Sequence, residues 1–415
     1  MPPVGGEWYA YPVRRRLHPR PTLRFAAVLA CWSGAIAVAE APPVALVPWV
    51  EGLTLPVAVA TAPEHADHWL IVQLEGLVLT VRDRTVRAVP FLDLRHRVTG
   101  LLGEQGLFSV AVEPRERAAQ RDRARHVVAA FTERDTGDLL VAAYPVDEDA
   151  WLADGFTEVE VLRIPMPDPF HHGGYVRFGP DGYLYVSVGD GHRTTPLAPR
   201  PEPDPGAGLR GRLLRVDLLP TAAPSPAYAV PRDNPFAAGA GGERPETWAR
   251  GFRNPWKFTF DPTTGDLIAV DVGADRWEEV NRVVPGGDYG WPAREGPACV
   301  ERADGSGLLD PGCPDAPHVP PWLVYGHLSL DPDGGNAVVG GVVVRDPQLE
   351  TLAGRYLFGD FVTGRVWSDD ATGPGRVLVL QAGPGLAAIE EGPDREILLA
   401  SLHGVVWRLV PAGER

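Results

Sequence analysis

Residues 179–188 read Gly-Pro-Asp-Gly-Tyr-Leu-Tyr-Val-Ser-Val, a turn followed at once by a run of apolar and aromatic side chains. The Pro-Asp-Gly core is typical of a tight turn, because Pro fixes φ and Gly accepts a positive φ. Tyr, Leu and Val then favour an extended strand. The stretch therefore predicts a strand that begins directly after a proline turn.

The same arrangement occurs six times along the chain. Short β-rich runs follow turns that contain Pro63, Pro114, Pro180, Pro262, Pro347 and Pro393. Long helical periodicity is nearly absent, so each copy is interpreted as the strand–turn–strand centre of a four-stranded antiparallel blade. We predict an all-β chain folded as one six-bladed β-propeller. A β-sandwich or two separate domains is the alternative.

The composition excludes several classes of protein. The chain of 415 residues is 44% hydrophobic, which rules out a disordered acidic tail. It contains 47 Gly and 44 Pro without a collagen period, as expected for many turns. Its formal charge is 39 − 54 = −15, and Lys257 is its only lysine. Nucleic acid and anionic membranes are therefore poor candidates for its main partner.

The first 39 residues resemble an export signal. Five arginines between Arg14 and Arg24 precede an apolar run, Phe25–Ala39, that ends in a small-x-small pattern. The run is shorter than the roughly 20 residues that span a bilayer. We predict a signal peptide over residues 1–39, with an N-terminal anchor as the alternative, and a single domain over residues 40–415. The protein is then periplasmic or secreted without a membrane span, or tethered, for instance through a lipid on Cys31.

Export would place the two remaining cysteines in an oxidising compartment. Cys299 and Cys313 lie close together in a segment rich in Gly, Pro and Asp. In an oxidising compartment we expect them to form a disulfide, worth roughly 3 kcal/mol on the chain-entropy argument. Two free thiols are the alternative.

The strongest local signal for chemistry is the stretch 170–174, Phe-His-His-Gly-Gly, just before a predicted strand. Neutral imidazole is a natural general base near pH 7, and the glycines allow a ligand to approach the backbone closely. Residues 189–192, Gly-Asp-Gly-His, end the same strand and are expected to face the same cavity. Two solvated loop histidines are the alternative.

Two further segments carry candidate binding groups. Arg253 and Asn254 precede a strand, and a guanidinium can clamp an oxygen-rich planar ligand through paired hydrogen bonds. Acidic residues in 271–281 lie near the glycine-rich segment 286–292, and together they offer oxygen ligands of the kind that Ca²⁺ prefers. An ordinary ion pair and solvated acidic loops are the alternatives.

In this order the segments resemble the soluble PQQ-dependent sugar dehydrogenases, which oxidise glucose, aldose sugars and sorbosone. Hedgehog-interacting-protein-like propellers share their fold. The resemblance runs from about Val50 to Val410 and rests on the following motifs: Gly103–Phe108, His171–Gly174, Phe178–Gly182, Arg212–Val216, Asp233–Phe236, Gly251–Pro255, Trp277–Asn281 and Asp288–Pro292.

The resemblance implies an exported quinoprotein that oxidises the anomeric hydroxyl of an aldose or related sugar to the lactone. His171 matches the general base that removes the hydroxyl proton while hydride passes to PQQ. Arg253 and Asn254 match cofactor-binding residues, and Glu104 and Phe170 match substrate-binding positions. The carbonyls of Gly273 and Ala274 match ligands of the Ca²⁺ bound to the quinone.

The resemblance also implies a second, structural Ca²⁺ site, whose matching residues are Glu279 and Tyr289. The electron acceptor and the oligomeric state are not implied.

The sequence departs from this family where the carboxylates of PQQ are bound. The matching stretches, residues 360–364 and 385–389, contain no cation, although Arg193, Arg365 or Arg376 could enter from neighbouring loops. Two other functions therefore stay open. One is a non-catalytic propeller that binds a glycan, a peptide or a protein. The other is a Ca²⁺-dependent lactonase with Glu104, Asp190, Asn254 and Glu279 around one ion.

Overall fold

A computed structural model describes residues 44–62, 68–99, 103–192, 207–219, 227–300, 317–369 and 375–413. They belong to one compact unit, Ala41–Arg415. The predicted signal peptide and Cys31 lie outside the described residues, and so does Cys313, so the leader and the disulfide stay predictions. Within the described ranges no helix is both long enough and apolar enough to cross a bilayer.

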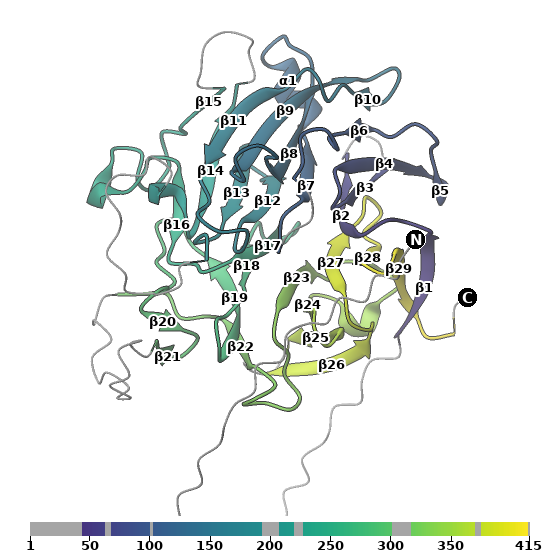
Figure 1. Ribbon diagram of the computed structural model, residues 1–415. Coiled ribbons are helices and arrows are strands. Elements are labelled where there is room, and N and C mark those ends of the chain that lie inside the picture. The colour runs from purple at the N-terminus through teal and green to yellow at the C-terminus, as the bar shows by residue number, and fades with distance from the viewer. Residues whose placement is uncertain are drawn as a thin grey trace, which may run out of the picture. The chain divides into compact units, whose positions relative to one another are not determined.

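The described strands form six antiparallel sheets arranged in a ring (Figure 1). The first sheet contains β2 (Pro56–Thr61), β3 (Trp69–Gln73), β4 (Leu77–Arg82), β5 (Thr85–Val86) and β6 (Leu92–Asp93). The second contains β7 (Leu107–Val112), β8 (His126–Thr132), β9 (Leu139–Asp147), β10 (Leu152–Ala153) and β11 (Val159–Ile164), with helix α1 (Arg115–Ala119) between β7 and β8. The third contains β12 (Gly173–Phe178), β13 (Leu184–Val188), β14 (Arg212–Leu218), β15 (Tyr228–Ala229) and β16 (Thr247–Arg250).

The other three sheets complete the ring. The fourth contains β17 (Pro255–Phe260), β18 (Leu267–Asp271), β19 (Trp277–Val283) and β22 (Leu323–Gly326), with a small hairpin of β20 (Arg294–Glu295) and β21 (Ala298–Cys299) beside it in sequence. The fifth contains β23 (Val338–Val343), β24 (Tyr356–Asp360), β25 (Arg365–Asp369) and β26 (Arg376–Gln381). The sixth contains β27 (Leu386–Glu391), β28 (Ile397–Ser401), β29 (Val405–Pro411) and β1 (Val44–Glu51). Three short 3₁₀ segments are Ala207–Leu209, Ala240–Gly242 and Glu350–Leu352.

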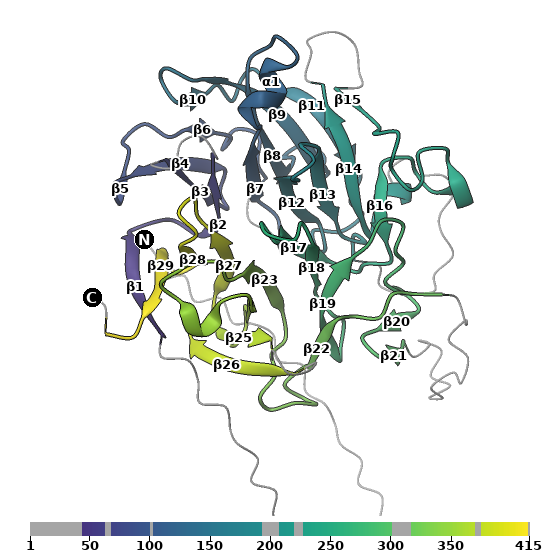
Figure 2. The ribbon, with the colours of Figure 1, turned by 180° about the vertical axis from the view of Figure 1, so that it is seen from behind.

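The ring is closed by its innermost strands and by its ends. Strands β2, β7, β12, β17, β23 and β27 pack against one another in cyclic order, and β27 packs against β2. The first described strand, β1, pairs with the last, β29, so the two ends of the domain share one sheet (Figure 2). The six-bladed β-propeller predicted from the repeats is confirmed. In the first three sheets two strands share the outermost position, which the sequence did not predict.

The proline turns have one common place in this fold. Pro114, Pro180, Pro262, Pro347 and Pro393 all lie between the innermost strand of a sheet and the strand that follows it. Pro63 lies outside the described residues. Each repeat copy therefore marks the first turn of a blade.

The blades are apolar on both faces because each face packs against a neighbouring blade. Every residue of β7 and β8 is buried, and clusters of Val, Leu and Ala join the first sheet to the second and the fifth to the sixth. The strands accordingly read as continuous apolar runs instead of alternating ones.

The centre of the ring is filled by side chains. Trp256 on β17 lies edge-on to Phe108 of β7, with 6.2 Å between ring centroids, and its indole N–H donates to the carbonyl of Ala387 on β27 at 3.3 Å. One residue further on, the ammonium of Lys257 lies 3.5 Å from the carboxylate of Glu390. These contacts separate the two ends of the channel.

His126, the first residue of β8, gives a prediction for stability. Burial, together with the nearby Arg123 guanidinium, lowers the pKa of His126 to about 4, against 6.5 for an ordinary His. Between pH 6.5 and 4 the histidine is protonated in the unfolded chain but not in the folded chain. The free energy of unfolding is therefore expected to fall as the pH drops through this range, by roughly 3 kcal/mol for a shift of this size. Urea unfolding between pH 4 and 8 should show a shallower pH dependence for His126→Gln than for the wild type. The exposed His403, changed to Gln, should leave the dependence unaltered, and equal slopes for all three proteins would contradict the prediction.

Candidate functional site

The sequence-predicted site residues meet at one end of the ring. Glu104, His171 and Arg253 precede β7, β12 and β17, three neighbouring innermost strands. The backbones of His171 and Arg253 are linked through residues 190–191, because the amide of Asp190 donates to the carbonyl of Arg253 at 2.7 Å and the amide of Gly191 donates to the carbonyl of His171 at 3.2 Å. His171 and Arg253 therefore lie in one site. We call this end of the ring the site end.

His171 is held by two carboxylates. Its Nδ1 lies 2.8 Å from Oδ1 of Asp190, and its backbone N–H donates to Oε2 of Glu104 at 2.8 Å. Its backbone φ is +56°, in the left-handed region that a bulky residue seldom adopts. Only 6% of the residue is exposed. Since a carboxylate accepts hydrogen bonds, Nδ1 carries the proton and Nε2 keeps a free lone pair.

Asp190 is fixed in turn by groups around it. Its Oδ2 accepts a hydrogen bond from the indole N–H of Trp291 at 2.8 Å, and its Oδ1 accepts the backbone N–H of His192 at 2.9 Å. The His192 ring lies edge-on to that of His171, with 4.8 Å between centroids. The carboxylate of Asp190 therefore orients the imidazole of His171, and its own orientation is fixed by hydrogen bonds from Trp291 and His192.

Trp291 gives a prediction for stability. Trp291→Phe removes the indole N–H and leaves an oxygen of Asp190 without that donor, so the free energy of unfolding should fall by about 1.5–3 kcal/mol, as for a hydrogen bond to a charged group. Urea unfolding measures the change. Trp248→Phe is a matched control, because the buried indole N–H of Trp248 has no hydrogen-bond partner among the described residues. Equal losses in the two variants would contradict the role given to the Trp291 N–H.

Arg253 and Asn254 are anchored by the end of β18. Their backbone N–H groups donate to the two oxygens of Asp271, at 2.8 Å and 2.6 Å. The Arg253 guanidinium lies over the Trp291 ring, 5.6 Å from its centroid, and uses Nη1 to bind the carbonyl of Val272 at 2.9 Å. Among the described residues, the other guanidinium donors of Arg253 have no further hydrogen-bond partner and are available to a ligand.

Asn254 and Glu104 act on the loop of His171. The amide oxygen of Asn254 accepts the backbone N–H of Gly173 at 3.2 Å, and its amide nitrogen donates to Oε2 of Glu104 at 3.4 Å. Asn254 is 3% exposed. The structure thus places both residues where they support the loop. Their predicted contacts with cofactor and substrate are not tested by it.

Phe170 presents an apolar surface beside the histidines. It is 37% exposed, and its ring lies edge-on to His192 with 5.3 Å between centroids. A Cβ on residue 103 would lie 3.0 Å from the Phe170 ring, so glycine at this position leaves the room that the ring occupies. An exposed ring of this kind can pack against an apolar face of a ligand, and its predicted contact with the substrate stays a prediction.

The segment predicted to bind calcium is organised around a different acid. Four successive backbone N–H groups, from Ala274 to Trp277, donate to Oε1 of Glu295 at 2.8–3.0 Å. The N–H of Gly273 donates to Glu278 at 3.3 Å. Since Ca²⁺ binds oxygen atoms, the groups of Gly273 and Ala274 that could bind it are their carbonyls. In the described ranges no group of three or more His, Cys, Asp or Glu side chains is placed to hold a metal. A Ca²⁺ here would depend on ligand and water oxygens for most of its usual six to eight contacts.

Glu279 and Tyr289 make separate contacts. Glu279 accepts the N–H of Gly296 at 2.5 Å and the side-chain amide of Asn281 at 3.1 Å, and burial raises its pKa to about 7. The Tyr289 hydroxyl donates to the carbonyl of Arg282 at 2.7 Å, near the other end of β19. Only the backbone of Tyr289 could therefore join Glu279 at a common ion. For the lactonase alternative, Asp190 and Glu104 both contact His171, and Asn254 contacts Glu104, whereas Glu279 contacts Gly296 and Asn281.

The cations expected to hold PQQ are absent from the described part of the site end. Arg365 donates to the carbonyl of Pro332 at 3.0 Å, and Arg376 binds the carboxylate of Asp331 at 2.5 Å. Lys257 is 4% exposed and paired with Glu390, and Arg193 lies outside the described residues.

The stretch 360–364 instead presents the buried acid Asp360, followed by Phe361 and Val362, which are 37% and 43% exposed. Three carboxylates placed here without partners would each cost several kcal/mol. The described residues therefore do not fit a tricarboxylate cofactor.

Some site residues were missed by the sequence reasoning. Asp190 was expected to face the same cavity or to bind Ca²⁺ in the lactonase alternative, and Asp271 was one of the acidic residues considered for Ca²⁺. Their contacts with His171 and with the backbone of Arg253 and Asn254 were not predicted, and Trp291 was given no individual role. Asp190 and Asp271 share a signal, since each stands at the end of the second strand of a blade, where the chain returns to the site end. No sequence signal links Trp291 to Asp190, which lies 101 positions away in the chain.

Comparison with known proteins agrees with this architecture. A family model described as glucose / sorbosone dehydrogenase matches residues 53–306, more than half of the chain. The HIPL1 protein of Arabidopsis thaliana is 34% identical over 229 residues, which cover 51% of this chain and 32% of that protein. Human Hedgehog-interacting protein is 27% identical over 328 residues, which cover 75% of this chain and 42% of that protein. The chain thus spans about a third of the length of the first relative and less than half of the second.

A solved structure shows the same fold. The PQQ-bound aldose sugar dehydrogenase of Streptomyces coelicolor superposes with a TM-score of 0.64 at 21% identity, covering 89% of this chain and 99% of that one. The resemblance predicted from the motifs is confirmed by the family match. The chain belongs to the glucose / sorbosone dehydrogenase family.

Proposed function

We propose that the chain oxidises the anomeric hydroxyl of an aldose or related sugar to the lactone, with His171 as the general base. The observation that carries the proposal is the buried 2.8 Å contact between Nδ1 of His171 and Asp190, in a chain of the sugar dehydrogenase family. The sequence of the first 39 residues supports a periplasmic or secreted protein.

The proton transfer follows from the geometry of the site. Loss of hydride from an un-ionised hydroxyl would build up positive charge on carbon, so the hydroxyl proton has to leave as the hydride leaves. Nε2 of His171 takes this proton, and Asp190 stabilises the imidazolium that results. The free donors of Arg253 can bind a ligand oxygen, and the exposed Phe170 ring offers an apolar face to the sugar.

The hydride acceptor is the point at which the chain departs from its resemblance. We expected PQQ with Ca²⁺, but the stretches 360–364 and 385–389 supply no cation, and Arg365 and Arg376 bind the segment 331–334. No step is therefore assigned to PQQ. Because the exposed Phe361 and Val362 stand where cations were expected, we propose that the acceptor is a quinone of low charge.

The experiment compares acceptors at a fixed sugar concentration. Purified protein is mixed with aldoses and either PQQ plus Ca²⁺ or the uncharged 2,3-dimethoxy-5-methyl-1,4-benzoquinone, and sugar-dependent reduction is followed optically. We expect the uncharged quinone to support the faster reaction. Saturation by micromolar PQQ with faster turnover would overturn the acceptor assignment and leave the role of His171 intact.

A second function is favoured by the apolar surface at the site end. Phe170, Leu328, Leu330, Phe361 and Val362 are all exposed, each between 37% and 50%, and all lie on loops at this end of the ring. Exposed apolar clusters commonly mark binding surfaces, so a non-catalytic propeller that binds a partner here is the competing function. Absence of turnover with every acceptor, together with retained sugar or protein binding, would select it.

A further inference from the structure

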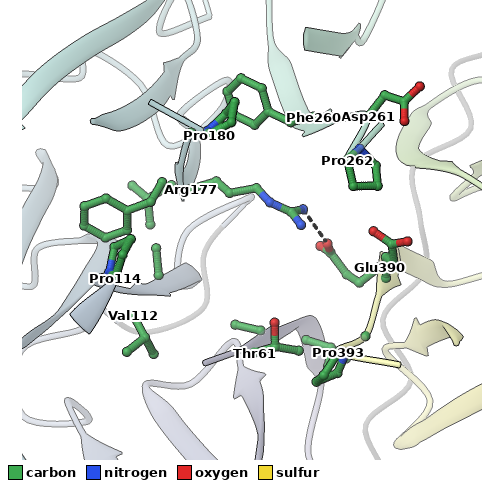
Figure 3. A pocket seen from close by; sticks show the side chains of 18 of the residues that line it. Thr61, Val112, Pro114, Arg177, Pro180, Phe260, Asp261, Pro262, Glu390 and Pro393 are labelled. Atoms are coloured by element: carbon green, nitrogen blue, oxygen red, sulfur yellow. Dashed lines mark ion pairs between the residues drawn. The ribbon is translucent and has the colours of Figure 1, made fainter. Parts of the chain in front are cut away.

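A pocket of about 640 Å³ opens at the far end of the ring, opposite the site end. It is lined by the last residues of five innermost strands and by their proline turns, including Pro114, Pro180, Pro262 and Pro393 (Figure 3). The site residues precede these strands, whereas the pocket follows their ends. A six-residue strand separates the two by about 17 Å.

None of Glu104, His171 and Arg253 lines the pocket. Trp256 and Phe108 fill the channel at one level, and Tyr175, Lys257 and Glu390 fill it at the next. Tyr175 and Glu390 are themselves part of the pocket lining, so this second level forms the pocket floor. A ligand in the pocket therefore meets neither His171 nor Arg253.

The floor holds two cations and one carboxylate. Glu390 accepts hydrogen bonds from the Tyr175 hydroxyl at 3.1 Å and 2.9 Å, lies 3.5 Å from the Lys257 ammonium, and lies 3.6 Å from the Arg177 guanidinium. Figure 3 shows Arg177 extended across the pocket towards Glu390. Both cations are beyond ordinary hydrogen-bond distance from the acid, and one carboxylate neutralises only one of them.

The other charged groups of the wall are already paired. Glu391 lies 3.3 Å from Arg395, and Asp261 lies 2.6 Å from Arg345. Arg177 interacts with the carboxylates of Glu390 and Glu391 and with the Tyr175 hydroxyl, and 29% of its side chain is exposed. Four cations around the pocket, Lys257, Arg177, Arg345 and Arg395, thus share three carboxylates, Glu390, Asp261 and Glu391, and Arg177 is a partly exposed cation that shares both of its carboxylates with others.

We propose that this pocket binds a small organic carboxylate with an apolar body. The carboxylate would bind the free donors of the Arg177 guanidinium, which suit a planar two-oxygen anion. The apolar body would lie against Phe178, Phe260 and the proline turns, which form part of the wall. The volume is in the range of ordinary small-molecule sites. This proposal does not depend on sugar oxidation at the site end.

The test compares three probes with the same eight-carbon chain. Octanoate, 1-octanol and octylamine are titrated into the full chain by calorimetry, and thermal unfolding is followed in parallel. We expect saturable octanoate binding that raises the unfolding temperature, and at least tenfold weaker binding of the other two probes. Arg177→Gln should weaken octanoate binding at least tenfold.

Control variants keep the outcome unambiguous. Arg95→Gln, which alters an exposed ion pair with Asp93 far from the pocket lining, and His171→Ala should both bind octanoate as the wild type does. Thr61→Trp fills the pocket without changing its charge and should also abolish binding, which covers the case that Arg177→Gln fails to fold. Equal binding of octanol and octanoate, or octanoate binding that survives both pocket variants, would overturn the proposal. Inorganic phosphate competing as well as octanoate would overturn the role of the apolar wall.

Discussion

Replacing His171 with Asn is expected to lower kcat/KM for sugar oxidation by roughly 10²–10⁴-fold, the usual contribution of a positioned general base. The variant removes the lone pair at Nε2 that receives the hydroxyl proton. The hydrogen bond to the Glu104 carboxylate comes from the backbone N–H of residue 171, so the variant keeps it and the loop should stay in place. The measurement is the initial rate of sugar-dependent quinone reduction at several sugar concentrations.

Asp190 provides the internal control for this prediction. Asp190→Asn keeps an oxygen near Nδ1 but loses the charge that stabilises the imidazolium, so it should reduce kcat more than it changes KM and shift the pH profile of the rate. The double variant should be no worse than His171→Asn, because both residues act in one proton transfer. The exposed His403, changed to Asn, should retain full activity. Additive losses from positions 171 and 190 would show that the two do not act as a pair.

Gly189→Ala is expected to reduce activity as severely as the loss of His171 itself. A Cβ at this position would lie 2.0 Å from the carbonyl oxygen of His171 and 3.0 Å from the amide oxygen of Asn254. Both contacts are too short, and the first involves backbone, so the loop that carries His171 has to move. Forced overpacking of this kind costs roughly 1–3 kcal/mol of stability, and a displacement near 1 Å can cost about 100-fold in rate.

The measurement pairs activity with urea unfolding. Gly239→Ala is the matched control, since a Cβ there meets nothing within 4 Å although its φ is +71°. That variant should lose some stability through backbone strain and keep its activity. Wild-type activity in Gly189→Ala would show that the position of the His171 loop does not limit the reaction.

The fold was largely predictable because one local pattern repeats. Pro180 and Pro262 stand at equivalent turns between the first two strands of their blades, and both were recognised from the dipeptide and the apolar run that follows. Such turns depend on neighbouring residues alone. The pairing of β1 with β29 joins residues such as Ala45 and Val410, whose partnership depends on closure of the ring, and no local pattern reports it.

The site was predictable to a lesser extent. His171 and Arg253 were identified from their motifs, and the structure brings them to one end of the ring. The bond from Trp291 to Asp190 and the sharing of Glu390 by Lys257 and Arg177 join separate blades across the ring. Such contacts follow from blade order and register, which the sequence expresses only through the complete fold.

The stretches 360–364 and 385–389 contain no cation, so the family resemblance does not extend to the groups that would bind the carboxylates of PQQ. A matched histidine and a matched arginine were enough to predict PQQ, but the cofactor needs compensation for three carboxylates. Arg365 and Arg376, which could have supplied it, are bound to the segment 331–334. The proposed base and the expected cofactor contacts are therefore separate parts of the family resemblance.

The most direct test of the role of His171 compares the amount of oxidised sugar with the amount of reduced quinone. The protein is incubated with an aldose labelled at C1 and the uncharged quinone, and the lactone or its hydrolysis product is quantified by NMR against the quinone reduced. We predict one equivalent of oxidised sugar for each equivalent of reduced quinone, and neither with His171→Asn. Reduced quinone without oxidised sugar, or no oxidised sugar with any acceptor, would contradict the assignment of His171 as the base of a sugar oxidation.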